Sequence, residues 1–407
     1  MGVVVIKGRP RAEGPRDARP AAGATAARGV VAMKRGWEKP RTDSQGLAVC
    51  GPLGDERRPV GAILRGSMIL NGYAVLAVFL ALIQLTLGVI VLRLGVVALK
   101  RRAAPAPGTE AAADSRLALL VLLSGVLVGV AALAWPLLYL LLDSYVPQWA
   151  GVMCIQGVTR IGTGSLGAAG WLPTLIDVLE VTKPLLVFAT GAWLVLHLVD
   201  RKTRTSPLHG RVLALVVVAG CLAAIDAAAQ LAYVGIPKKE QFLAQGCCTV
   251  GPGAVSSTAG EPTSPWVPVT FYVFLVAVLA AAWRADVAAR RGLAETRTRT
   301  AILLLGVLAS IPVGVAFLHD IASPAFLGKP GHRCVYCLIS SSPLGVAAVS
   351  LYLVGILATA WACVARALGA HEETRPFLSA PTSALTRAGI LGYAAAGLIA
   401  TARWITA

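Results

Sequence analysis

The chain has 407 residues, of which 56% are hydrophobic and only 14% are charged, against about 25% charged residues in an ordinary soluble domain. Together with a mean hydropathy of +0.71, this composition argues against a water-soluble enzyme. The formal net charge of +17 at pH 7 would suit a nucleic-acid partner, but the basic residues are spread over short loops between apolar runs. That distribution is typical of a membrane protein and argues against nucleic acid.

Residues 1–67 are basic, rich in Pro, Gly and Ala, and show no hydrophobic period, so we expect them to be disordered. They contain no apolar stretch of the kind found in a secretory signal. One interpretation is a basic arm that binds anionic lipid or nucleic acid. The other, which we favour, is an unstructured extension or a translation start at Met68.

Eight apolar runs are long enough to cross a bilayer as helices, because the bilayer core takes about 20 residues. Each is much longer than a barrel strand, and lipid offers no partner for an open backbone. The sequence therefore predicts an all-α, polytopic bundle of about eight transmembrane helices in the lipid bilayer. The runs are 69–99, 116–142, 175–198, 211–235, 266–284, 300–319, 342–366 and 386–405. Three of them fall in a segment 68–210, four in 211–366 and one in 367–407.

The loops between these runs alternate in charge. The loops after the first, third, fifth and seventh runs hold sixteen Lys and Arg, whereas the intervening loops hold five. Lys and Arg collect on the cytoplasmic side of membrane proteins. We therefore expect the loops with few charges to face the periplasm or exterior of a bacterial inner membrane.

Most of the eight cysteines follow this topology. Five lie in or beside the outward loops, where an oxidising compartment permits disulfides. They are Cys154, Cys247, Cys248, Cys334 and Cys337, and all five are disulfide candidates. Cys221 and Cys363 fall inside predicted helices and are expected to be small buried apolar side chains. Outward loops with Cys at positions 154, 247 and 334 also indicate a weak threefold repeat of helical hairpins.

The strongest motif is GHRCVYCLISS at 331–341, which contains the C-x-x-C pair Cys334 and Cys337. A spacing of three places both sulfurs on one face of a helical turn. The N-terminus of a helix lowers the pKa of such thiols, and thiolates are the nucleophiles of disulfide exchange. We predict a redox-active dithiol, with a structural disulfide as the alternative. Leu338 after the pair excludes haem attachment, and no second Cys/His pair completes a zinc site, so no metal is expected.

The segment 211–366 resembles the vitamin K epoxide reductase family. The similarity rests on the string CVYCLISSS at the start of the run 342–366, on the loop cysteines Cys247 and Cys248, and on the four runs themselves. It implies a four-helix bundle in which the C-x-x-C opens the fourth helix. It also implies an electron relay in which the loop cysteines exchange with a substrate or a thioredoxin-like exoplasmic protein.

In that relay Cys334 would be the shuttle cysteine, and Cys337 would pass electrons to a quinone held in the bundle. The sequence departs from the family because Cys247 and Cys248 are adjacent, whereas the family separates its loop pair. A disulfide between neighbours is strained. One of the two could instead pair with Cys154 and leave the other as the exchanging thiol.

Two polar positions near the membrane remain open to two interpretations each. An acid inside a membrane helix is often functional, so Asp226, four residues before Gln230, could be a proton relay or could hydrogen-bond a quinone. The alternative is a structural acid that reaches the outer interface or bonds to another helix. His319, beside Asp320, either assists proton transfer or is an ordinary cation at a helix C-terminus. Glu180 and Lys183 are predicted to form a structural i,i+3 pair.

We therefore expect a membrane thiol–disulfide oxidoreductase that passes electrons between exoplasmic cysteines and a quinone. The alternatives are a non-catalytic membrane subunit with outer loops stapled by disulfides, and a transporter.

Overall fold

The computed structural model describes residues 71–103, 110–149, 152, 154–163, 167–237, 264–291, 296–328 and 332–406. Within these ranges the chain is helical and contains no strand. Eight helices of the described residues are long and apolar enough to cross a membrane, the number that was predicted, and the all-α class is confirmed. The last of them begins at Arg375, well before the predicted 386. Residues 1–67, Cys247 and Cys248 lie outside the described residues.

The outer surfaces of these helices suit lipid. Large apolar side chains protrude from most of them, including Leu122 at 64% exposure, Val273 at 61% and Leu391 at 69%. A soluble monomer rarely exposes so much continuous apolar surface. The surface and the lengths of the helices together agree with an integral membrane protein.

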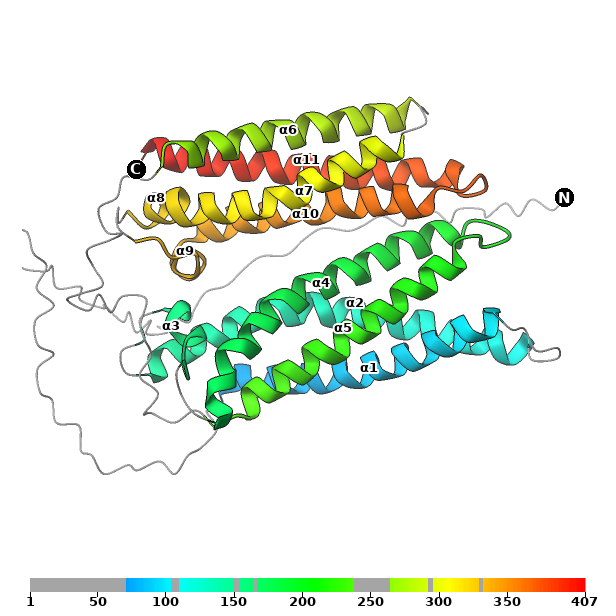
Figure 1. The fold of residues 1–407 in the computed structure, drawn as a ribbon, viewed down its shortest axis with the longest axis horizontal. Coiled ribbons are helices and arrows are strands. Elements are labelled where there is room, and N and C mark those ends of the chain that lie inside the picture. The colour runs from blue at the N-terminus through cyan, green and yellow to red at the C-terminus, as the bar shows by residue number, and fades with distance from the viewer. Residues whose placement is uncertain are drawn as a thin grey trace, which may run out of the picture. The chain divides into compact units, whose positions relative to one another are not determined.

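The eight helices form two four-helix units (Figure 1). The first contains α1 (Gly72–Ala103), α2 (Glu110–Tyr145), α4 (Leu172–Asp200) and α5 (His209–Gly235). The second contains α6 (Trp266–Arg290), α7 (Arg297–Phe317), α10 (Pro343–Gly369) and α11 (Arg375–Thr406). In each unit every helix packs against the next in sequence, and the fourth packs back against the first. The helices of both units therefore pack in the same order, as a closed ring of four.

This division differs from the predicted bundle over 211–366. The helix at the start of that segment, α5, packs against α1 and α4 in the first unit, and α11 completes the second unit. The C-x-x-C accordingly precedes the third helix of its unit rather than the fourth. Cys154 and Cys334, 180 residues apart, each lie between the second and third helices of their unit, whereas Cys247, the third position of the predicted repeat, lies outside the described residues.

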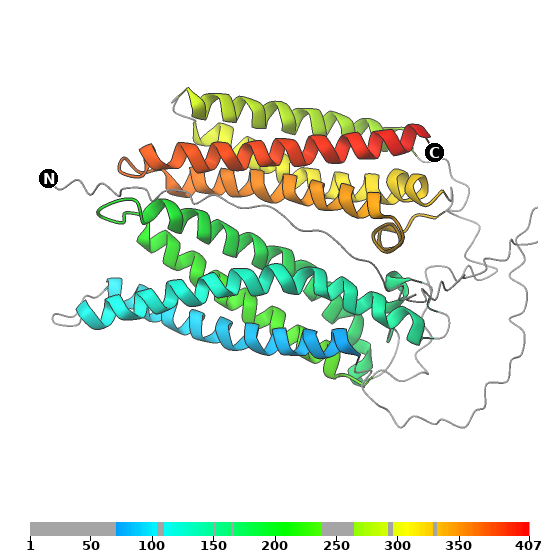
Figure 2. The same ribbon diagram turned by 180° about the vertical axis from the view of Figure 1, so that it is seen from behind.

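The connections between second and third helices contain short elements at one end of each unit (Figures 1 and 2). In the first unit they are η1 (Val146–Gln148), α3 (Ile155–Thr159) and η2 (Gly167–Trp171). In the second they are the π-helix η3 (Leu318–Ala322), α8 (Ser323–Leu327) and α9 (Val335–Ser341).

The units meet mainly through their third helices, α4 and α10. The indole N–H of Trp361 on α10 donates a hydrogen bond of 2.9 Å to the carbonyl oxygen of Phe188 on α4. Gly191 makes room for that ring, because a Cβ at this position would lie 2.3 Å from Cζ2 of Trp361. At the opposite end from the cysteine loops, the carboxylate of Glu373 accepts hydrogen bonds from the backbone N–H groups of Arg204 and Thr205.

Candidate functional site

Three cysteine sulfurs meet where the two units adjoin. The Sγ atoms of Cys154, Cys334 and Cys337 all lie within 4.8 Å of one another, and those of Cys154 and Cys334 are 4.0 Å apart. Cys154 and Cys334 are buried, while Cys337 is partly exposed. No disulfide joins the described cysteines. Since a disulfide bond measures about 2.05 Å, the sulfurs of each pair must approach by about 2–3 Å to bond.

Apolar anchors on either side hold the sulfurs in place. Cys154 immediately precedes α3, whose Ile155 and Val158 are buried in the core of the first unit. Cys334 immediately precedes α9, whose Leu338 is fully buried in the core of the second unit. The site therefore exists only when both units are folded and docked.

The prediction that the C-x-x-C opens a membrane helix is wrong. The motif occupies the start of α9, a separate helix of seven residues. The helix α9 ends before Ser342. The hydroxyl oxygen of Ser342 accepts a hydrogen bond of 3.1 Å from the backbone N–H of Gly345 and caps α10. The proline at position 343 suits the first position of that helix. The dipole of a long helix therefore does not act directly on these sulfurs.

The thiols themselves dominate the acidity of Cys337. Hydrogen bonds with the sulfurs of Cys154 and Cys334, followed by burial, raise the pKa of Cys337 above its ordinary value. This is the opposite of the lowering expected from a helix N-terminus. The reduced site consequently keeps the Cys337 proton at neutral pH.

Alkylation of Cys337 by a maleimide provides a test, because only the thiolate reacts. We expect the midpoint of its rate against pH to lie above the value of about 8.5 for an ordinary thiol. The double variant Cys154→Ala/Cys334→Ala removes the groups that raise the pKa, so its midpoint should fall toward the ordinary value. Mass spectrometry of the labelled peptide measures both midpoints. Equal midpoints in the two proteins would contradict the proposed thiol cluster.

Tyr336, between the two cysteines, docks α9 of the second unit onto the first. Its hydroxyl donates a hydrogen bond to the carboxylate of Glu180 on α4, and its ring centroid lies 6.3 Å from that of Tyr139 on α2. Burial and the Glu180 carboxylate raise the pKa of Tyr336, so the hydroxyl remains a donor at physiological pH. The predicted structural pairing of Glu180 with Lys183 does not form: each residue has a different partner.

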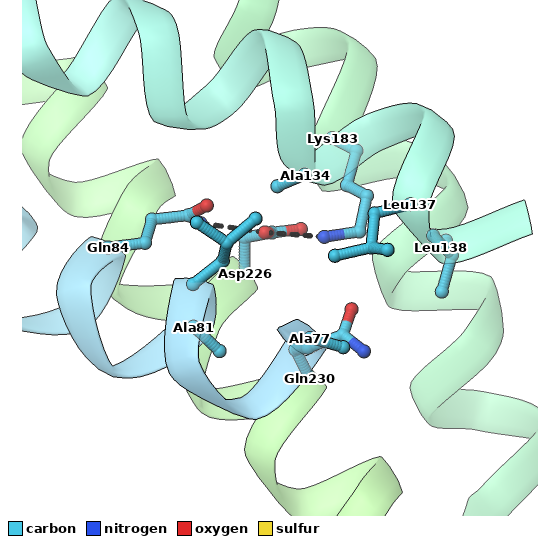
Figure 3. Close-up of a pocket in the computed structure, with 10 residues that line it drawn as sticks. Ala77, Ala81, Gln84, Ala134, Leu137, Leu138, Lys183, Asp226 and Gln230 are labelled. Carbon is cyan, nitrogen blue, oxygen red and sulfur yellow. Dashed lines mark hydrogen bonds and ion pairs between the residues drawn. The ribbon is translucent and has the colours of Figure 1, made fainter. Parts of the chain in front are cut away.

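Asp226 is the centre of a buried polar cluster in the first unit (Figure 3). Its Oδ2 lies 3.0 Å from Nζ of Lys183 on α4 and accepts a hydrogen bond of 2.7 Å from Nε2 of Gln84 on α1. Its Oδ1 accepts the hydroxyl of Thr182 at 2.7 Å. Asp226 is only 1% exposed, so it does not extend to the interface. Its partners lie on other helices, α1 and α4.

None of the other predicted residues that the structure describes belongs to the group of sulfurs. His319 is 51% exposed and pairs with Asp320 at 2.8 Å, and Nη1 of Arg333 lies 4.0 Å from the same carboxylate. Cys221 is exposed on α5, which contradicts its predicted burial, and Cys363 is buried in the core of the second unit as predicted.

The sulfur cluster supplies three ligands that could hold a soft metal ion, and no fourth His, Cys or carboxylate of the described residues joins them. A structural zinc site needs four, so disulfide exchange fits the three sulfurs better. In comparisons with known proteins, no family model, curated protein or solved structure matches the chain.

Proposed function

We propose that this protein is a membrane thiol–disulfide oxidoreductase and that Cys154, Cys334 and Cys337 form its reaction centre. The observation that carries this proposal is the convergence of three sulfurs, from equivalent connections of two separate units, to within 4.8 Å. A third thiol beside a C-x-x-C is what disulfide exchange requires, since a thiolate must reach a disulfide sulfur.

The exchange step involves only these three residues. With Cys334 and Cys337 joined, the Cys154 thiolate attacks Sγ of Cys334, which lies 4.0 Å away in the described state. The Cys154–Cys334 bond forms, the Cys334–Cys337 bond breaks, and Cys337 leaves as a thiolate that takes up a proton. The step moves a disulfide from one pair to another without net oxidation.

Net turnover needs a donor and an acceptor. We place the centre on the exoplasmic side of a bacterial inner membrane, because the loops at the other ends of the helices carry most of the Lys and Arg. A thioredoxin-like exoplasmic dithiol is the proposed donor, with Cys247 and Cys248 as candidates for contact with it. A membrane quinone is the proposed acceptor: dithiol and quinone give disulfide and quinol, with two electrons and two protons transferred.

A non-reducing peptide map tests the exchange centre. Membranes that contain the full chain are oxidised with diamide, remaining thiols are blocked with a maleimide, and the protein is digested. We expect a peptide with Cys154 disulfide-linked to the peptide with Cys334 and Cys337. The link should disappear in Cys154→Ser and persist in Cys363→Ser, a matched control for a cysteine outside the cluster. Its absence from the wild type would refute the centre.

The acceptor is tested on the same membranes. Protein reduced with dithiothreitol and freed of it is given decylubiquinone, and thiols are trapped over time. We expect the wild type to re-oxidise with the quinone and Cys337→Ser to remain reduced. If Cys337→Ser left the redox cycling of the other cysteines unchanged, the quinone-linked function would be wrong.

A further inference from the structure

The Lys183–Asp226 pair has no part in the exchange step. Burial of its two charges costs free energy of folding. Lys183 and Asp226 are 3% and 1% exposed in the middle of helices that are apolar enough to span a membrane. A buried ion pair usually stabilises a protein less than apolar side chains of the same size. Ionisable groups at such depth commonly mark proton or ion pathways.

A small cavity adjoins the pair and is lined by Gln84, Lys183, Asp226 and Gln230 together with apolar residues of α1 and α2 (Figure 3). Gln230 is 4% exposed, and its side-chain Nε2 has no hydrogen-bond partner among the described residues. An unmet buried donor costs about 1–3 kcal/mol. The cavity volume of about 10 Å³ suits a single water molecule, and its polar lining offers the partners that a buried water needs.

Glu180 on α4 lies between this cavity and α9 of the reaction centre in the order of contacts. Glu180 lies three residues before Lys183, so the two side chains share a helix face one turn apart. Glu180 in turn accepts the hydroxyl of Tyr336, which lies between the two cysteines of the C-x-x-C. Tyr336 and Glu180 are therefore in direct contact, Lys183 and Asp226 are in direct contact, and one turn of α4 separates the two pairs.

We propose that Lys183, Asp226 and one water beside Gln230 form a proton-holding site that exchanges a proton with the thiol centre through Glu180 and Tyr336. This inference rests on the proposed redox function and adds a second site to it, in the other four-helix unit. Among the described residues, the groups that face Asp226 are Lys183 and Thr182 from α4, Gln84 from α1 and Gln230 from α5. Of these, the Lys183 amine is the one that can exchange a proton with Asp226.

In the redox cycle of the centre, such a site holds a proton between its release by a thiol and its uptake by the quinone. Reduction of the Cys334–Cys337 disulfide by an external dithiol transfers two electrons and two protons from that dithiol to the two cysteines. The neighbouring sulfurs favour the protonated form of Cys337, so that thiol keeps its proton. Oxidation by a quinone releases two protons from the thiols and consumes two at the quinone. Through the relay, the Lys183–Asp226 pair holds one of these two protons until the quinone takes it up, so the two protons that leave the thiols are the two that the quinol gains.

Infrared difference spectroscopy tests the relay without the natural partner. The full chain in liposomes is reduced with dithiothreitol or oxidised with diamide, and thiol trapping verifies the redox state of the cysteines. We expect a redox-dependent C=O band of a protonated carboxyl group. It should shift in protein labelled with [4-¹³C]aspartate and vanish in Asp226→Asn. It should persist in Asp286→Asn, because Asp286 is an equally buried aspartate in the second unit.

Two further variants separate the possible outcomes. Lys183→Met/Asp226→Asn removes both charges and should lack the band even if Asp226→Asn alone folds poorly. Cys334→Ser keeps Asp226 but should lose the redox dependence. If the cysteines change redox state while no aspartate band shifts in the labelled wild type, the proton-holding site is overturned and the redox function stands. If the cysteines do not change redox state, both proposals fail.

Discussion

Asp226→Asn is expected to lower the free energy of unfolding by about 3–5 kcal/mol, because it leaves a buried ammonium group without its counter-charge. Asp226 is the one acceptor found for Lys183 Nζ in the described part of the chain, and Lys183 is only 3% exposed. Reversible unfolding in mixed detergent micelles measures this change.

The complementary variant should cost less. In Lys183→Met, Asp226 keeps the hydrogen bonds from Gln84 and Thr182 and can become neutral by binding a proton. The double variant Lys183→Met/Asp226→Asn has no unpaired charge and should recover most of the lost stability, since replacing a whole buried pair is often neutral or stabilising. A double variant as unstable as Asp226→Asn would show that the two charges do not stabilise each other.

Asp286→Asn is the matched control for this cycle. Asp286 is also 1% exposed, but its partners Arg290 and Arg387 are 45% and 54% exposed and remain in contact with polar surroundings when the carboxylate is lost. We expect a cost of about 1 kcal/mol, in the range of pairs with solvated partners. A loss as large as that of Asp226→Asn would mean that the cost does not depend on the burial of the remaining cation.

The number of helices was predictable, whereas their grouping was not. Each span can be recognised in the sequence by its length and apolar content, because a helix needs about 20 apolar residues to cross a bilayer. The choice of partners depends on close contacts such as that of Gly191 with Trp361, for which the hydropathy of single helices gives no signal. The prediction based on the C-x-x-C therefore placed α5 in the bundle that contains α6, α7 and α10. Chain order and short connections favour α11 as the fourth helix of that bundle.

Only part of the candidate site was predictable, because its contacts also depend on how the two units pack. Loop charge and topology predicted that Cys154 and the C-x-x-C share one side. Their contact depends on the docking of α9 through Tyr336 and Glu180, a tertiary interaction between residues 156 positions apart. Lys183 was assigned to Glu180 by the local i,i+3 rule, but its partner Asp226 lies on another helix. The signal available in the sequence was the presence of one buried acid and one buried base in neighbouring spans.

Gly220→Leu should have the second large effect on stability, because it separates α1 from α5. A Cβ at position 220 would lie 2.8 Å from the backbone nitrogen of Leu92 and 3.0 Å from the carbonyl oxygen of Gly88. Backbone atoms of a packed helix cannot move aside as a flexible side chain does, so the helices must part. We expect a loss of about 3 kcal/mol or more, at the upper end of the cost of overpacking, measured in the same mixed micelles.

Gly129→Leu on α2 makes the same chemical change where nothing lies within 4 Å of the added Cβ, and leucine has the higher helix propensity. It should leave stability unchanged or slightly raised. Separation of α1 from α5 in Gly220→Leu would also withdraw Gln84 from Asp226, since these two residues lie on the two helices. Gly220→Leu should therefore weaken the coupling between Lys183 and Asp226 in the double-variant cycle, and an unchanged coupling would mean that α1 and α5 tolerate the larger side chain.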